Sequence, residues 1–234
     1  MKQLTLSVVL VICGVTVASA QTKTYFGLEA SIFSDRSIIY DNGEWLESAI
    51  MTDPMGGGHV RQEVGKDFFW EAGVVIKPYW RGYNFKSFIV PVLSVNYFSW
   101  LIPLRAGKMI DLHHDKIFLV PVIGYSLGIQ PQMQLRQSSG VRRFNGNLIT
   151  YADRENGNVS RQFSLVQAGV GVEFKFFRRL LWSINTNYYK GFNTITRIDI
   201  TYSVNGGAPT TGTATAKGDF WSVGTALRYP IATR

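Results

Sequence analysis

The C-terminal segment 219–229 alternates between apolar and small or polar residues with a period of two. Successive side chains of a β-strand point to opposite faces, so this alternation predicts a strand with two different faces. The apolar face consists of Trp221, Val223, Thr225, Leu227 and Tyr229, and the other face of Ser222, Gly224, Ala226 and Arg228. In a membrane barrel the apolar face contacts lipid and the small face lines the lumen, whereas a soluble sandwich packs its apolar face inside.

The same alternation recurs along the chain, and no segment shows a helical period. It predicts eight strands, at residues 24–33, 68–77, 87–95, 98–109, 117–129, 162–177, 181–204 and 219–229. The expected connections 34–66, 130–161 and 205–217 are long, and those after the second, fourth and sixth strands are short. An even strand number with alternating loop lengths is typical of bacterial outer-membrane barrels. The link near 96–97 departs from the scheme, because it should be long and is short.

Charged residues fall on the small faces of several different strands. They are Glu29, Glu71, Arg105, Glu173, Lys175 and Arg228. An isolated charge in a dry sandwich core costs several kcal/mol, but three acids and three bases that meet inside a barrel neutralise one another. An eight-stranded barrel is just wide enough for its own side chains to fill it. The pattern therefore predicts an ionic network that plugs the lumen, and the alternative is a gated path for protons or ions.

Residues 1–20 have the pattern of a secretory signal peptide. Lys2 provides a positive start, an apolar segment covers 4–17, and Ala18-Ser19-Ala20 forms a small-x-small cleavage site. The barrel domain is then 21–234. Cys13 is the only cysteine and lies in the signal, so the mature chain has no disulfide, no thiolate nucleophile and no cysteine metal site. No later apolar run approaches the ~20 residues of a spanning helix.

The chain carries a formal net charge of +8, with 46% hydrophobic and 14% aromatic residues among its 234. Basic proteins often bind nucleic acid, but here Lys and Arg are scattered singly among apolar strands. We therefore expect no nucleic-acid partner. The aromatic content suits strands, and an aromatic belt at the membrane interfaces is predicted from Trp70, Trp100, Trp221 and Tyr229.

Three stretches resemble known outer-membrane proteins. Residues 222–229 resemble the insertion signal on the last strand of such proteins, with Ser222, Gly224, Leu227 and Tyr229 at the signal positions. Tyr97-Phe-Ser-Trp-Leu-Ile-Pro-Leu104 and Tyr188-Tyr-Lys-Gly-Phe-Asn-Thr-Ile195 resemble segments of the PorT-like outer-membrane β-barrel family. The resemblance implies an outer-membrane location and insertion by the barrel-assembly machinery. The roles of the family vary, and one branch serves protein secretion. Family members usually end on an aromatic residue, whereas five residues follow Tyr229 here.

Candidate catalytic and metal-binding residues are few. His113 and His114 fall in a predicted turn, and His59 falls in the first long loop, where it is the one histidine placed to serve a catalytic site at the outer rim. The segment 153–158 is rich in oxygen ligands but lacks the spacing of an EF-hand. Asn158-Val-Ser160 fits a glycosylation sequon. The first loop also carries apolar side chains that would pack over the barrel mouth or bind a partner, namely Trp45, Leu46, Ile50, Met51 and Met55.

These observations predict an all-β protein, an eight-stranded antiparallel up-and-down transmembrane β-barrel in the bacterial outer membrane, with no cofactor and no metal. Its expected partners are membrane lipid, the barrel-assembly machinery and a protein bound at the extracellular loops. The expected role is non-enzymatic, in binding, adhesion or assembly. One alternative is a small lipid-modifying enzyme with a site at His59. The other is a soluble periplasmic barrel with an apolar ligand, which requires the Trp70/Val74, Val170/Phe174 and Trp221/Leu227 faces to point inward.

Overall fold

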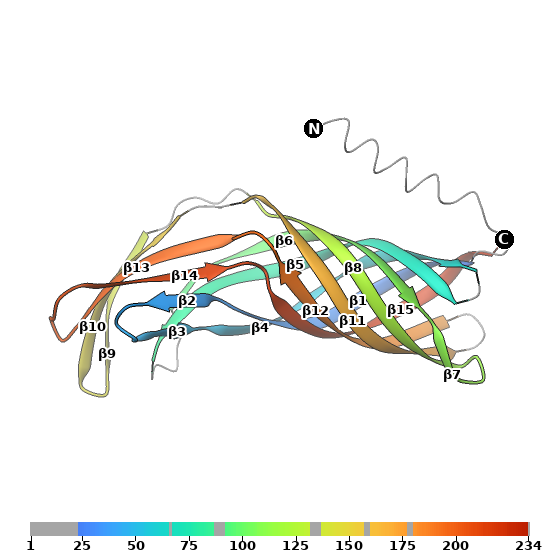
Figure 1. Ribbon diagram of the computed structural model, residues 1–234, viewed down its shortest axis with the longest axis horizontal. Coiled ribbons are helices and arrows are strands. Elements are labelled where there is room, and N and C mark those ends of the chain that lie inside the picture. Colours follow the sequence, from blue (N-terminus) through green and yellow to red (C-terminus); the bar gives the residue numbers. More distant parts are fainter. Residues whose placement is uncertain are drawn as a thin grey trace.

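The computed structural model describes residues 23–233, except 66, 87–91, 132–136, 157–159 and 177–179, so the predicted signal peptide 1–20 lies outside the described residues. Eight long antiparallel strands form a closed barrel (Figure 1). In order around the wall they are β1 (Lys23–Arg36), β4 (Ile50–Val64), β5 (Phe68–Phe85), β6 (Val92–Lys108), β8 (Ile117–Ile129), β11 (Gln162–Phe176), β12 (Leu180–Gly191) and β15 (Phe220–Thr233). The last strand pairs with the first, which closes the wall and confirms the predicted fold.

The predicted number of strands was right only because two errors cancelled. The segment expected as one long loop contains β4, and the expected strands 87–95 and 98–109 fall in the single strand β6, with 87–91 outside the described residues. The Pro54-Met-Gly-Gly-Gly run was interpreted as a breaker, but these residues pair with β1, and three of them also pair with β5. At Gly57 a Cβ would lie 2.7 Å from the Cα of Val75, so the glycine permits a close approach of two strands.

The long connections fold into a second sheet beyond one end of the barrel (Figure 1). We call it the loop sheet; its strands in order are β2 (Ile38–Asp41), β14 (Thr210–Ala216), β13 (Thr196–Val204), β10 (Asn147–Glu155) and β9 (Gln137–Phe144). The expected strand 181–204 is thus two strands, β12 in the barrel and β13 in the loop sheet. A short strand, β3 (Leu46–Ser48), pairs with the far end of β5.

The barrel end beside the loop sheet is called the loop end, and the opposite end is called the turn end. At the turn end the connections are short, and the hairpin strand β7 (Ile110–His113) pairs with β8. Both described termini of the barrel, Lys23 and Thr233, pair with each other there. β5 ends at Phe85 and β6 begins at Val92, so both strands run on toward the loop sheet. The link near 96–97, which departed from the predicted alternation, lies inside β6 and is not a connection. The connection after the second expected strand, which the alternation grouped with the short turns, follows β5 at the loop end, so this expectation is wrong.

The outer surface of the barrel is apolar. Its exposed side chains include Phe26, Leu28, Ile32, Val74, Ile102, Leu104, Ile123, Val170, Ile184, Val223 and Leu227. Trp221 is 59% exposed and Leu227 is 48% exposed, so the faces that a soluble barrel would turn inward point outward. No helix in the described part of the chain is long and apolar enough to cross a membrane.

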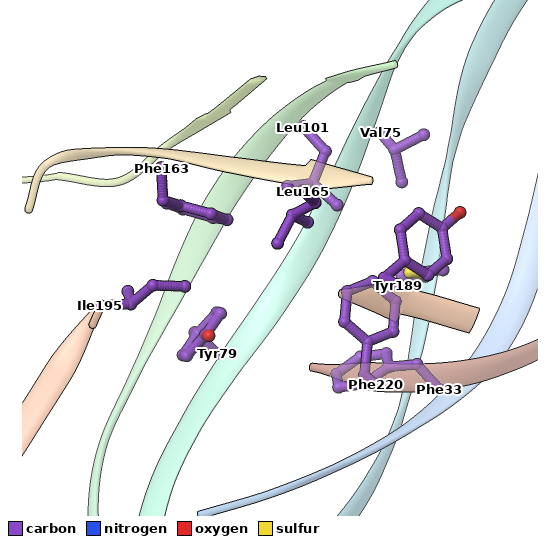
Figure 2. Packing of buried hydrophobic residues seen from close by; sticks show 10 residues of the cluster. Phe33, Val75, Tyr79, Leu101, Phe163, Leu165, Tyr189, Ile195 and Phe220 are labelled. Carbon is purple, nitrogen blue, oxygen red and sulfur yellow. The ribbon is translucent and has the colours of Figure 1, made fainter. Parts of the chain in front are cut away.

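Apolar side chains fill both ends of the interior. Near the turn end Phe69, Met109 and Val120 form a small cluster. Toward the loop end lies a larger one, which we call the upper cluster (Figure 2). Its residues are Phe33, Met55, Val75, Tyr79, Leu101, Phe163, Leu165, Tyr189, Ile195 and Phe220. The rings of Tyr189 and Phe220 stack at 4.2 Å between centroids and add rigid aromatic packing to this cluster.

The loop sheet has a hydrophobic cluster of its own. It consists of Leu46, Tyr83, Phe85, Ile149, Tyr151, Ile198, Ile200, Tyr202 and Ala214. Trp45 packs against it, so two apolar residues of the first loop bury themselves there, while Met55 lies in the upper cluster and Ile50 is 70% exposed. The long connections are therefore packed structures rather than solvated loops.

Asp41 fixes the corner between β2 and β3. Its carboxylate accepts hydrogen bonds from the backbone amides of Gly43 (3.1 Å), Trp45 (2.7 Å) and Leu46 (2.7 Å), and from the Tyr202 hydroxyl (2.7 Å). Partial burial opposes ionisation of this group, but the hydrogen bonds outweigh it and hold the pKa of Asp41 below its ordinary value. Burial, together with the hydrogen bond to Asp41, raises the pKa of Tyr202.

We predict that Asp41→Asn loosens the loop sheet at neutral pH, because an amide nitrogen cannot accept the hydrogen bonds that it replaces. The expected loss is about 1–2 kcal/mol of local stability, measured as faster limited proteolysis of the loops with the barrel intact. Since the pKa is lowered on folding, this stabilisation is present above the unfolded pKa of 3.8 and is lost as the pH falls through the folded value. Wild type and variant should therefore converge in acid. Equal cleavage rates at pH 7 would contradict the assignment.

Candidate functional site: the charged interior of the barrel

Charged side chains from six strands meet inside the barrel between the two apolar clusters. The alternation of each strand turns them inward, because each shares the parity of the small residues on its strand. They are Glu29 on β1, His59 and Arg61 on β4, Glu71 on β5, Arg105 on β6, Glu173 on β11 and Arg228 on β15. All but Glu29 are buried as residues, and the Glu29 side chain is only 14% exposed.

Two arginines and two glutamates form the centre of this network. Arg61 Nε donates to Glu71 Oε1 at 2.6 Å, and its Nη1 donates to both Glu173 oxygens at 2.8 and 3.0 Å. Arg228 binds the same two carboxylates, with Nε to Glu71 Oε1 at 3.0 Å and Nη1 to Glu173 Oε2 at 2.8 Å. Each glutamate thus bridges both guanidinium groups, which ties together strands on opposite sides of the wall.

A second pair lies beside this centre. Arg105 binds Glu29 with both terminal nitrogens, at 2.6 and 3.0 Å, in the two-point geometry that guanidinium and carboxylate favour. Its Nε donates to Gln167 Oε1 at 3.1 Å. Gln167 in turn donates to Asn187 at 2.8 Å, so a polar chain continues from the ion pair to β12.

His59 lies between Arg228 and Glu29. Arg228 Nε lies 2.9 Å from His59 Nε2, and a guanidinium can only donate a hydrogen bond. The single N–H on Arg228 Nε is shared with Glu71 Oε1 at 3.0 Å, and the other ring nitrogen, Nδ1, lies 3.9 Å from Glu29. The network holds three guanidinium groups and three carboxylates besides His59, so the charges of these six groups sum to zero.

Gly27 on β1 makes room for these groups. A Cβ at this position would collide with the His59 imidazole and lie 2.9 Å from Arg228 Cγ. The absence of a side chain at Gly27 therefore leaves room for His59 and Arg228 to pack against β1. The space left beside the network is only about 40 Å³, enough for a few water molecules.

Of the six residues predicted to share the interior, the structure brings five together. Lys175 is the exception: it lies at the turn end, beside Lys23, Glu63 and Lys108, and it forms no ion pair within 4.0 Å in the described chain. Arg61 was not among the predicted residues, because β4 was taken for a loop. The expectation that His59 lies in a loop near the outer rim is wrong for the same reason, since its side chain is 1% exposed inside the barrel.

A further ion pair lies higher in the interior, next to the upper cluster. Lys77 Nζ is 2.7 Å from Asp35 Oδ2 and lies over the ring of Phe33 at 3.7 Å from its centroid. The lysine is 1% exposed. The ring face and the carboxylate together compensate the buried ammonium group.

The other predicted sites are distributed as follows. On β15, Ser222 is buried inside, and Leu227 and Tyr229 lie on the outer surface. Of the predicted belt, Trp70 and Tyr229 lie near the turn end, and Trp100 and Trp221 lie toward the loop end. Asp153 is buried in β10 and accepts a hydrogen bond from Tyr83 at 2.9 Å. No group of three possible metal ligands occurs among the described residues, and Asn158 of the sequon lies outside them.

Solved structures similar to this chain include outer-membrane proteins. OprG from Pseudomonas aeruginosa aligns over 90% of this chain and 96% of its own, with a TM-score of 0.50 and 9% identity. The chain has the fold of the small outer-membrane barrels. A major outer membrane protein from Thermus thermophilus (88% and 99% covered, TM-score 0.45, 10% identity) and Neisserial surface protein A (89% and 98%, 0.42, 10%) are also similar. No family model and no curated protein sequence matches the chain.

We predict that Glu173→Gln destabilises the barrel by about 3 kcal/mol or more, because two buried guanidinium groups lose a charged partner. The measurement is the urea midpoint of the heat-dependent gel mobility shift, which reports the folded barrel. Lys175→Gln is the matched control: it lies on the same strand, two residues further, outside the network. It should change the free energy of unfolding by less than about 0.5 kcal/mol. Equal effects of the two substitutions would show that the network contributes nothing specific.

Proposed function

We propose that the mature chain is a non-conducting outer-membrane barrel whose loop sheet forms a binding surface outside the cell. The supporting observation is that the interior is filled by charged and aromatic groups, while the long connections are built into an ordered sheet with its own hydrophobic cluster. A protein that conducts needs an open interior and has no need of a packed sheet above it. The role is then binding, adhesion or assembly.

The membrane location is supported by the outer surface. A continuous band of exposed apolar side chains surrounds a closed wall, and closure satisfies the backbone groups that lipid cannot. The basic, apolar and small-residue pattern of 1–20 supports export by a signal peptide. In bacterial barrels short turns face the periplasm and long loops face the outside, so the loop sheet is assigned to the cell exterior.

We also propose that the chain belongs to the PorT-like family and, through it, has a place in a secretion apparatus. These proposals are supported by the segments 97–104 and 188–195. The residues Ser222, Gly224, Leu227 and Tyr229 are proposed to be read by the barrel-assembly machinery. Tyr229 and Leu227 are outward and accessible on the closing strand, as a recognition signal requires.

A non-enzymatic role is favoured over lipid hydrolysis or acyl transfer. The enzyme hypothesis needed His59 as a base near the outer rim. In the barrel this imidazole accepts a hydrogen bond from Arg228 and lies behind the upper cluster, away from any lipid substrate outside.

Cysteine labelling tests the orientation, since the mature chain has no cysteine of its own. Ala208→Cys is exposed in the loop between β13 and β14, and Lys116→Cys is exposed at the turn end. A membrane-impermeant maleimide should label Ala208→Cys on intact cells and Lys116→Cys only after the outer membrane is permeabilised. The reverse pattern would place the loop sheet in the periplasm and remove the proposed role.

Planar bilayer recording tests the closed interior. The folded wild-type protein should give no steady single-channel conductance above the protein-free bilayer, because only about 40 Å³ is free beside the network. Heat-dependent gel mobility on the same sample confirms that folded protein was inserted. A reproducible, steady conductance would refute the non-conducting assignment and favour the ion-path hypothesis.

A further inference from the structure

The barrel wall opens at one seam on its outer surface. The pairing of β1 with β15 ends at Asp35 and Phe220, and pairing resumes only between Ile38 of β2 and Thr215 of β14. Between these points the chain turns away at Gly218, whose φ of +85° is a backbone conformation suited to glycine. The seam lies where the barrel ends and the loop sheet begins.

A groove of about 480 Å³ lies along this seam. Its lining includes Trp221 and Ile50, which are 59% and 70% exposed, so the groove faces outward rather than into the barrel. Its polar side contains three cations, Arg36, Lys190 and Lys217. In the membrane orientation proposed above, the groove is at the outer boundary of the apolar band.

The acidic residues of the groove are already neutralised. Asp35 binds Lys77 at 2.7 Å on the inner side of the wall. Asp219 pairs with Lys190 and accepts the backbone amide of Gly191 at 2.8 Å, which holds the lysine in place. Arg36 and Lys217 are exposed and form no ion pair within 4.0 Å in the described chain. The groove thus carries two uncompensated positive charges.

The apolar side of the groove continues into the outer surface of the barrel. The rings of Tyr188 and Trp221 lie 4.7 Å apart between centroids. On the same outer face follow Val223, which is 59% exposed, and Ile32, which is 60% exposed. Amphipathic aromatic rings lie at headgroup level in membranes, and cations just beyond them face lipid phosphates.

We propose that this groove binds the phosphate group of an anionic lipid of the outer leaflet. Arg36 and Lys217 contact the phosphate, and Lys190, positioned by Asp219, lies at its edge. The rings of Tyr188 and Trp221 contact the first carbons of the acyl chains. The proposal rests on the membrane orientation of the proposed function, but not on any partner of the loop sheet. A bound lipid would cover the seam, where the backbone pairing between β1 and β15 has ended.

The test is a titration of the folded protein in neutral detergent with phosphatidic acid, followed by native mass spectrometry. The wild type should bind one lipid saturably and phosphatidylcholine far more weakly. Arg36→Gln/Lys217→Gln should weaken binding on the order of twentyfold, at about fivefold for each cation near a lipid surface. Lys86→Gln/Arg143→Gln, which removes the same charge from exposed positions near or in the loop sheet, should leave the affinity unchanged. Heat-dependent gel mobility checks that each variant is folded.

Three results would overturn the proposal. Equal weakening by both double variants would mean nonspecific attraction by net charge. Equal affinity for phosphatidylcholine, whose choline neutralises its phosphate, would mean that the net negative charge of the headgroup is not recognised. Displacement of phosphatidic acid by inorganic phosphate at matching concentration would identify a site for a free anion rather than a lipid. Failure of the proposed function is a separate result, since maleimide labelling reports the orientation of the loop sheet and the detergent titration does not depend on it.

Discussion

The interior of an eight-stranded barrel must be filled by its own side chains, and this chain fills the middle of it with charge. Three guanidinium groups and three carboxylates are tolerable there only because they pair with one another. Removing any one partner leaves a buried charge uncompensated, which is far more costly than the net value of the pair. The structure therefore depends on keeping six strands in register around one set of hydrogen bonds.

The apolar clusters above and below make these bonds stronger. Phe69 lies under the network, with Arg61 over its ring at 3.8 Å from the centroid, and Tyr189 and Phe220 lie above it. Water is largely excluded from between the charges, so their attraction is screened less than on a surface. Stability and the proposed closed state of the interior thus depend on one arrangement of side chains.

The sequence predicted the fold class because alternation with a period of two is a local property, readable without any knowledge of strand partners. It also predicted that Glu29, Glu71, Arg105, Glu173 and Arg228 face inward, since the face of a residue depends only on its parity along the strand. The position of a side chain along the barrel axis does not follow from parity. Lys175 has the correct parity but lies too near the turn end to reach the network, and parity alone cannot report this distance.

The missed elements have a common physical cause. In β4, Pro54 and three consecutive glycines look like a loop, and only the neighbouring backbones of β1 and β5 turn them into a strand. In the loop sheet, β2 pairs with β14 across more than 160 residues of chain, and such long-range pairing of short strands leaves no local pattern. Because β4 was not predicted, His59 and Arg61 were not assigned to the interior. The network was therefore predicted without one of its central arginines.

The strand β5 runs through the small cluster at the turn end, the charged network, the upper cluster and the loop sheet. On β5 the buried positions include, from the turn end, Phe69 in the small cluster at that end, Glu71 in the network, Lys77 with Asp35, Tyr79 in the upper cluster and Tyr83 in the cluster of the loop sheet. An irregularity between Tyr79 and Arg81 shifts the register with β6 without interrupting the strand. Because the backbone of β5 is continuous, the position of Tyr83, and with it the bond to Asp153, is set by the same strand that holds Glu71 between two arginines. The loop sheet is therefore held in place by the charged interior as well as by its own hydrophobic cluster, which makes it a fixed surface rather than a set of independent loops.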